Sequence, residues 1–290
     1  LVGSEMCIRD SHEIPNPLPK KQYPVWIGIA VVITVVSVTL VSTGIVPVTT
    51  LSTVVTVIAL IAAVVLWWQM YSSPLTTKSE KTRLVGFIPM FVSGVLFFGI
   101  FQQQFTVLAI YSDIRLDREI FGWEMSPAWI NSINPIFIIA FSMVFAAAWS
   151  KLGDRQWSTP VKFGVANIII GISLFFFIPF SGGGENSTPL YAIIWILFLF
   201  TMGELMLSPV GNALATKVAP AAFPSRMMAV WLMAVAMGTS LAGTLAGFYN
   251  YEDAAAENTF FITLGIASVV LGLILLALRK WIVKEFVDVR

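Results

Sequence analysis

The chain has 290 residues, of which 57% are hydrophobic and 11% are charged, and its formal net charge is +1. Soluble domains carry about 25% charged residues, so this composition excludes an ordinary water-soluble fold and indicates a protein of the lipid bilayer. The small net charge gives no argument for a nucleic-acid partner. The single cysteine and histidine, Cys7 and His12, both precede the first apolar run. We therefore expect no intramembrane disulfide, no metal site and no cofactor.

Residues 1–12 resemble nothing in the rest of the chain. They lack the apolar core that a signal peptide requires. Two interpretations fit residues 1–24, namely sequence that is not native to the protein or a disordered cytosolic segment. Both place the start of the fold at about residue 25.

Apolar runs of membrane-spanning length follow in regular order. A bilayer core of about 30 Å requires roughly 20 apolar helical residues. Scanning on that length predicts an all-α membrane protein with eight transmembrane helices, at 25–46, 51–72, 86–112, 128–150, 159–180, 189–215, 226–249 and 258–281. Proline and glycine clusters separate these spans, as turns between helices require.

The segments between the spans sort their basic residues to alternate sides of the membrane. One side receives 14 of them, Lys20, Lys21, Lys78, Lys81, Arg83, Lys151, Arg155, Lys162, Lys217, Arg226, Arg279, Lys280, Lys284 and Arg290. The other side receives Arg115 and Arg118 together with most loop acids. The positive-inside rule then places both ends of the chain in the cytoplasm. A wrong number of helices would scramble this sorting, so it also supports the count of eight.

The first two spans differ in composition from the other six. They are rich in Val, Ile and Thr and hold almost no polar groups beyond hydroxyls, which is typical of helices that face lipid. A linker of mixed charge, 76–83, separates the two groups. We predict a two-helix accessory insertion at 25–75, a six-helix bundle at 84–283 and a cytoplasmic tail at 284–290.

Glu204 is the one acidic residue in the middle of a predicted span. A charge at the bilayer centre costs about 2.5–3.5 kcal/mol on insertion scales, so such residues are generally functional and face a cavity or a partner. No basic residue lies at a comparable depth in this chain. Glu204 therefore pairs with a segment that is not present, is protonated at rest, or pairs with a cationic ligand. The structural alternative is a protonated carboxyl that bonds to a neighbouring helix.

Other polar residues lie near Glu204 in the predicted bundle. Ser208 follows it by four residues on the same helix face, and Pro209 frees a backbone carbonyl, as in helices that line cavities. In the third span, Gln102 begins a run of three glutamines, of which at least one must point into the bundle because a helix turns about 100° per residue. Such amides hold a peptide backbone or simply join helices.

Two further spans carry candidate groups. Asn131 and Asn134 share a face at the start of the fourth span, and Pro135 kinks the helix there. Trp231 lies too deep in the seventh span for the interfacial belt, so it is either a core residue or a pocket wall. No HExxH, CxxC, GxSxG or P-loop motif is present, so we expect no enzyme and no ATP-driven pump.

Several sequence blocks together resemble the proton-dependent oligopeptide transporters, a branch of the major facilitator superfamily. The blocks are 97–108 (FFGIFQQQFTVL), 132–137 (SINPIF), 158–163 (STPVKF), Gly203-Glu204-Leu205 with Ser208-Pro209-Val210-Gly211, and Arg226-Met227-Met228 before Trp231. The segment 151–155 (KLGDR) also resembles the basic loop motif of the wider superfamily. The resemblance covers nearly the whole chain after the first twenty residues.

The resemblance implies the C-terminal half of a bacterial proton-coupled di/tripeptide symporter of the inner membrane, preceded by two extra helices. The N-terminal six-helix half, with its ExxER motif and pocket lysine, would be a separate segment. In the family, the carboxylate that matches Glu204 receives the amino terminus of the peptide and pairs with that lysine. The asparagine that matches Asn134 contacts the peptide, and the tryptophan that matches Trp231 lies in the binding region.

Two positions depart from the family pattern. Many members have a tryptophan where Phe98 stands, and an acid at or near Gln102 that takes part in proton coupling or gating. A glutamine cannot titrate, so Glu204 would carry more of the proton handling. The predicted substrate-binding residues are Glu204, Asn134, Ser208, Trp231, Phe98 and Gln102, with short peptides and protons as partners. The alternatives are a relative that moves another small substrate and a non-transporting membrane scaffold subunit.

Overall fold

The computed structural model describes residues 20–44, 47–120 and 122–286. The interpretations offered above for residues 1–24 therefore lie outside the described part as far as residue 19, whereas residues 20–24 belong to helical elements. The chain divides into two compact units, 1–51 and 52–290, and each is described by itself.

In the first unit, the 3-10 turn η1 (Lys20–Gln22) leads into helix α2 (Tyr23–Ser42). Most described side chains of α2 are exposed, including large apolar ones such as Val32, Ile33 and Val38 at 61–62%. An exposed apolar surface of this kind is compatible with lipid and not with water, as predicted for the first span.

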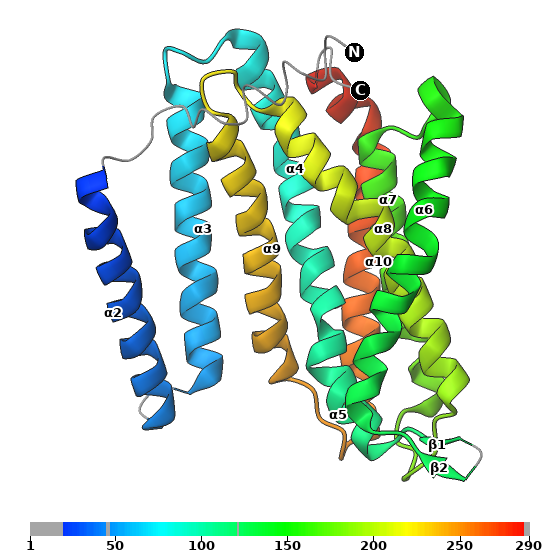
Figure 1. Ribbon diagram of the computed structural model, residues 1–290. Coiled ribbons are helices and arrows are strands. Elements are labelled where there is room, and N and C mark those ends of the chain that lie inside the picture. Colours follow the sequence, from blue (N-terminus) through cyan, green and yellow to red (C-terminus); the bar gives the residue numbers. More distant parts are fainter. Residues whose placement is uncertain (1–19, 45–46, 121, 287–290) are drawn as a thin grey trace. The chain divides into compact units, whose positions relative to one another are not determined.

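The second unit is a bundle of long helices (Figure 1). Its helices are α3 (Val48–Ser72, which starts in the first unit), α4 (Lys78–Phe101), α5 (Val107–Ile114), α6 (Ile133–Leu152), α7 (Thr159–Phe175), α8 (Leu190–Val218), α9 (Pro224–Ala246) and α10 (Ala254–Glu285). The short elements are η2 (Gln102–Phe105), η3 (Pro127–Ser132), η4 (Gly153–Arg155), η5 (Ile178–Phe180) and a two-stranded ribbon of β1 (Glu119–Ile120) and β2 (Trp123–Glu124). Within the described residues, eight helical stretches are long and apolar enough to span a membrane, so the predicted count is confirmed.

The predicted third span differs from the observed helix at both ends. Thr77 caps α4, because its hydroxyl accepts from the Glu80 backbone N–H while the Glu80 carboxylate accepts from the Thr77 backbone. This capping box starts the helix at Lys78, so most of the predicted linker 76–83 is helical. At the other end, the glutamines form a 3-10 turn that separates α4 from α5.

Glycines bring pairs of helices into backbone contact. A Cβ on Gly171 of α7 would lie 2.7 Å from the Gly265 carbonyl oxygen of α10, and one on Gly164 would lie 2.9 Å from that of Gly272. Only glycine permits so close an approach, and small residues serve this purpose where lipid removes the hydrophobic drive between helices. Helices α7 and α10 are therefore tightly packed against each other.

Helix α3 is hydrogen-bonded to α9 and to α4. Hydroxyl and carbonyl groups of Ser52 and Ser240 bond reciprocally between α3 and α9. At the other end of α3, the Trp67 indole Nε1 donates to the Leu84 carbonyl of α4 at 3.1 Å. The boundary between the two compact units falls at residue 51, inside α3. The division into an accessory insertion at 25–75 and a six-helix bundle at 84–283 stays a prediction.

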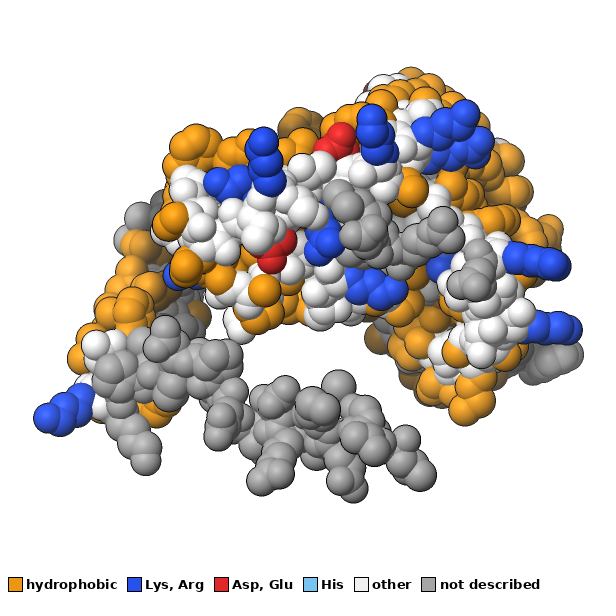
Figure 2. Space-filling model, turned by 90° about the horizontal axis from the view of Figure 1, so that it is seen from above, with side chains coloured by type: hydrophobic (Ala, Val, Ile, Leu, Met, Phe, Trp, Pro, Cys, Tyr) orange, Lys and Arg blue, Asp and Glu red, His pale blue; other side chains and the backbone are white. Residues whose placement is uncertain are grey.

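The two ends of the second unit carry opposite charge. The α3–α4, α6–α7 and α8–α9 connections and the end of α10 lie together at one end, and the α5–α6, α7–α8 and α9–α10 connections lie at the other (Figure 1). Figure 2 looks onto the first of these ends and shows lysine and arginine side chains across it. We call these the basic end and the acidic end.

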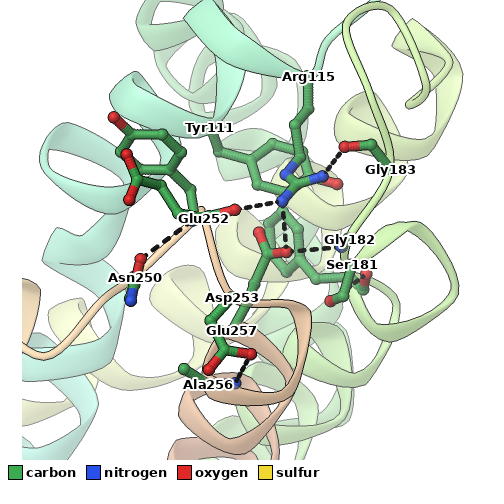
Figure 3. A network of polar contacts seen from close by, with 12 residues as sticks. Tyr111, Arg115, Ser181, Gly182, Gly183, Asn250, Glu252, Asp253, Ala256 and Glu257 are labelled. Carbon is green, nitrogen blue, oxygen red and sulfur yellow. Dashed lines mark hydrogen bonds and ion pairs between the residues drawn. The ribbon is translucent and has the colours of Figure 1, made fainter.

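A buried ion pair lies at the acidic end (Figure 3). Arg115 follows α5 and its Nη2 lies 3.0 Å from Glu257 Oε2 in the first turn of α10, with side chains 3% and 0% exposed. The Glu257 carboxylate also accepts from the Gly182 N–H at 2.9 Å and from the Tyr249 hydroxyl at 2.8 Å. Burial, followed by this bond, raises the pKa of Tyr249, so the phenol stays a donor at physiological pH.

The same arginine reaches two loops that are distant in sequence. Its guanidinium donates to the carbonyl oxygens of Gly183, in the α7–α8 connection, and of Tyr251, in the α9–α10 connection. One cation therefore ties three segments together, and both oxygens of its carboxylate partner accept hydrogen bonds. A buried pair needs such additional bonds to offset the desolvation of both charges.

We expect Glu257→Gln to lower the thermal stability of the protein strongly. Breaking a buried pair from one side leaves an uncompensated charge and costs about 3–5 kcal/mol. Helix loss on heating, followed by circular dichroism in detergent, measures the shift in apparent Tm. Glu185→Gln is the matched control, because Glu185 is an exposed acid in a connection at the same end. Equal Tm values for the two variants would contradict this role of the pair.

Candidate functional site

Glu204 is half-buried on α8, the 29-residue helix that carries Pro209 in its interior. The carboxylate lines a groove of about 490 Å³. One wall comes from α8, with Glu204, Leu205, Ser208, Pro209 and Asn212, and the other from α6, with Ile138, Ser142, Phe145, Ala146 and Trp149. The groove therefore runs from the middle of both helices toward the basic end.

The Asn134 amide of α6 bridges two groups of α8. Its Nδ2 donates to Thr201 Oγ1 at 2.9 Å and to Glu204 Oε2 at 3.3 Å. Asn134 is 4% exposed and Thr201 is 0% exposed, so this contact is shielded from the bilayer. The structure thus brings together Glu204 and Asn134, which the sequence placed on different spans without linking them.

The lining chemistry is one acid among apolar and neutral polar groups. Among the described residues that line the groove, Glu204 is the only charged one. Phe145 and Trp149 give an aromatic surface, and Ser142 and Asn212 give neutral hydrogen-bonding groups. Such a site suits a small molecule with a cationic group beside an apolar portion, because convergent polar groups in an apolar cleft fix orientation.

A buried lysine supports the basic end of the α6 wall. Lys162, in the first turns of α7, is 7% exposed, and its Nζ lies 4.1 Å from the ring centroid of Trp149. The same Nζ donates to Gln156 Oε1 at 2.8 Å. A desolvated ammonium over an indole face makes a cation–π contact that holds the ring in place.

Trp231 lies in the core and does not line the groove. It is 1% exposed, and its ring packs against those of Phe87, Phe98 and Phe163 at centroid distances of 5.9–6.3 Å. Its Nε1 donates to Asn212 Oδ1 at 2.9 Å, and Asn212 does line the groove. The structure therefore supports the core alternative for Trp231, with an indirect connection to the groove through one hydrogen bond.

Phe98 and Gln102 also lie away from the groove lining. Phe98 is 6% exposed in the aromatic core beside Trp231. The Gln102 Nε2 donates to Thr239 Oγ1 of α9 at 3.0 Å. In the same turn, Gln103 Nε2 donates to the Ala242 carbonyl of α9. The glutamine segment thus joins α4 to α9, and at least one of its amides points into the bundle, as predicted.

Sequence reasoning missed four residues of this region, Thr201, Asn212, Ser142 and Trp149. Each is of a type that is common in membrane helices, so nothing in its own identity marks it. A partial signal existed for Thr201, which precedes Glu204 by three residues and shares its helix face.

Comparison with known proteins decides the family. The POT family model matches residues 2–262 of this chain. This chain belongs to the POT family.

Two curated relatives are 34–37% identical to this chain. An uncharacterized transporter, YclF, of Bacillus subtilis is 37% identical over 268 residues, which is 91% of this chain and 54% of the relative. A di-/tripeptide transporter of Lactococcus lactis subsp. cremoris is 34% identical over 234 residues, which is 78% of this chain and 46% of the relative. The chain therefore spans about half the length of the curated relatives that it matches.

Solved structures of POT transporters share the fold. A mutant of a peptide transporter POT in complex with alafosfalin superposes with a TM-score of 0.80 at 36% identity, covering 94% of this chain and 55% of that one. A POT family transporter in complex with 5-aminolevulinic acid gives a TM-score of 0.78 at 32% identity, covering 92% and 56%. The multi-pass all-α membrane fold predicted from the sequence is confirmed, and its six-helix arrangement is that of POT transporters.

We expect Gly211→Ala to destabilise the protein by displacing Trp231. A Cβ at Gly211 would lie 2.0 Å from Trp231 Cζ2, and overpacking of this kind costs about 1–3 kcal/mol. Circular dichroism on heating measures the loss. Gly184→Ala is the control, since a Cβ there meets nothing within 4 Å. The packing role of Trp231 is refuted if Gly211→Ala unfolds at the same temperature as Gly184→Ala.

Proposed function

We propose that this chain supplies the C-terminal half of a proton-coupled di/tripeptide symporter, with Glu204 as the group that meets the amino terminus of the peptide. The observation that carries the proposal is the contact that Asn134 of α6 makes with Glu204 of α8, the one acid among the described residues that line the groove. An acid at this depth with only neutral lining groups is suited to a cationic ligand. The similarity to di-/tripeptide transporters supports peptides as the substrate class.

Glu204 itself would couple proton movement to peptide binding. Glu204 would alternate between a protonated state and a charged state that pairs with the peptide ammonium group or with a lysine of the N-terminal half. Two six-helix halves would rock about the midplane site, as in other secondary transporters. The membrane potential adds about 2.3 kcal/mol per charge per 100 mV to inward movement.

Of the other predicted residues, two would contact the peptide directly and three would act indirectly through their neighbours. Asn134 and Ser208 would contact the peptide beside Glu204, since both border the acid. Trp231 would act through Asn212, and Phe98 and Gln102 would act through the packing of α4 on α9. Gln102 cannot titrate, so proton coupling in this half would rest on Glu204.

A second substrate class has one supporting observation. A structurally similar POT transporter binds 5-aminolevulinic acid, a small molecule with an amino group and a carboxyl group. The same Glu204 contact would serve any small primary amine. Competition of such amines against labelled dipeptide uptake separates a broad amine transporter from a peptide-selective one.

We expect Glu204→Gln to reduce proton-driven dipeptide uptake by about tenfold or more in the full transporter, reconstituted in proteoliposomes. The variant keeps the shape of the side chain and removes a charge-assisted hydrogen bond worth about 1.5–3 kcal/mol. Glu252→Gln, an exposed acid at the acidic end, is the control and should leave uptake unchanged. Undiminished uptake by Glu204→Gln would remove Glu204 from the mechanism.

The basic end is proposed to face the cytoplasm, which places both ends of the chain on that side. Single cysteines at two exposed positions, Lys151→Cys and Glu185→Cys, report the two ends in a background that carries Cys7→Ser. A membrane-impermeant maleimide should label position 185 in intact cells and position 151 only after permeabilisation. The reverse labelling pattern would invert the orientation.

A further inference from the structure

The Thr201 hydroxyl makes two hydrogen bonds beside Glu204. The residue lies on α8 one turn before Glu204 and is fully buried. Its Oγ1 donates to the Leu197 carbonyl at 2.8 Å and accepts from Asn134 Nδ2 at 2.9 Å. The hydroxyl therefore has one bond within its own helix and one to α6.

The chemistry of the hydroxyl fixes the direction of the second bond. A threonine hydroxyl has a single hydrogen and can also accept. Because that hydrogen is directed to the Leu197 carbonyl, the oxygen can only accept from Asn134. The amide of Asn134 must then present its nitrogen to α8, and its oxygen is turned away.

The orientation of this amide decides what Glu204 meets. With nitrogen toward α8, Asn134 donates to Glu204 Oε2 at 3.3 Å, and a donated hydrogen bond favours the charged carboxylate. A flipped amide would present an oxygen, which cannot bond to a carboxylate and favours a protonated carboxyl. The orientation of this one neutral amide therefore biases the balance between the two protonation states of the acid.

We propose that Thr201 is a positioning residue that sets the protonation preference of Glu204 through the Asn134 amide. The inference rests on the proposed function, because it identifies what prepares Glu204 to receive an ammonium group. Neither Thr201 nor Asn134 is among the residues that line the groove, so the effect of Thr201 on a ligand passes through Asn134 to Glu204.

The helices packed against α8 bring no charged side chain to the described lining of the groove beside Glu204. The protonation preference of Glu204 therefore depends on neutral partners. The segments 84–101 of α4, 133–150 of α6 and 227–246 of α9 contain no Asp, Glu, Lys, Arg or His. On α7, Lys162 is the charged residue, and its Nζ is engaged with Trp149 and Gln156 at the basic end of the groove. On α8 itself, Lys217 lies near the C-terminal end, well beyond the groove residues.

The test compares Thr201→Val, which keeps the shape and removes the acceptor, with Thr201→Ser, which keeps the hydroxyl. The full transporter with Thr201→Val should show a KM for dipeptide about tenfold higher, and its uptake profile should shift toward higher pH. Thr201→Ser should retain both properties of the parent protein. A change in abundance or thermal stability alone, with KM and pH profile intact, would mean a structural role and would overturn the proposal.

A second readout does not depend on transport. Infrared difference spectra of this chain in lipid nanodiscs record the carboxylic acid band of Glu204 as pH is changed, and Glu204→Gln identifies the band by its loss. Its titration midpoint should rise in Thr201→Val and stay unchanged in Thr201→Ser. An unmoved midpoint in Thr201→Val overturns the inference, whether or not the full transporter carries peptides. Absent uptake with a moved midpoint would count against the proposed function alone.

Discussion

The main constraint on the bundle is a carboxylate at membrane depth, Glu204, to which the described residues offer no basic partner. A charge there is costly, and the described residues around Glu204 offer only neutral groups. Asn134 donates to it from α6, and Thr201 orients that donor from α8. The carboxylate is thereby placed on an open groove wall and is only partly satisfied. A partly satisfied acid in such a position is suited to an exchange between a proton and an ammonium group.

The remaining helices give this groove a firm support on one side. Backbone contact at glycines holds α7 against α10. The Arg115–Glu257 pair joins the end of α5 and the start of α10 to the α7–α8 and α9–α10 connections. In contrast, α6 packs mainly on α8, and side chains such as Ile139 and Met143 are 76–80% exposed. One wall of the groove therefore belongs to the dense part of the bundle, and the other is a helix with a largely open outer face.

The aromatic core couples the groove to the packing of α4 and α9. Trp231 fills the space that Gly211 leaves on α8, and its indole N–H is satisfied by Asn212. A buried indole N–H needs a hydrogen-bond acceptor. Asn212 supplies that acceptor and also lines the groove. Phe98 packs against Trp231 in the same cluster.

The sequence by itself determined the membrane class, the eight spans, the opposite charge of the two bundle ends and the anomaly of Glu204. These follow from local composition, because bilayer thickness and the cost of buried charge act on each segment separately. Only the tertiary structure decided that Asn134 and Thr201, 67 residues apart, meet at Glu204. It also decided that Trp231 is core and that Arg115 and Glu257, which the sequence left as loop charges, form a buried pair. Such pairings depend on which helices become neighbours, and a periodic apolar pattern does not encode its partner.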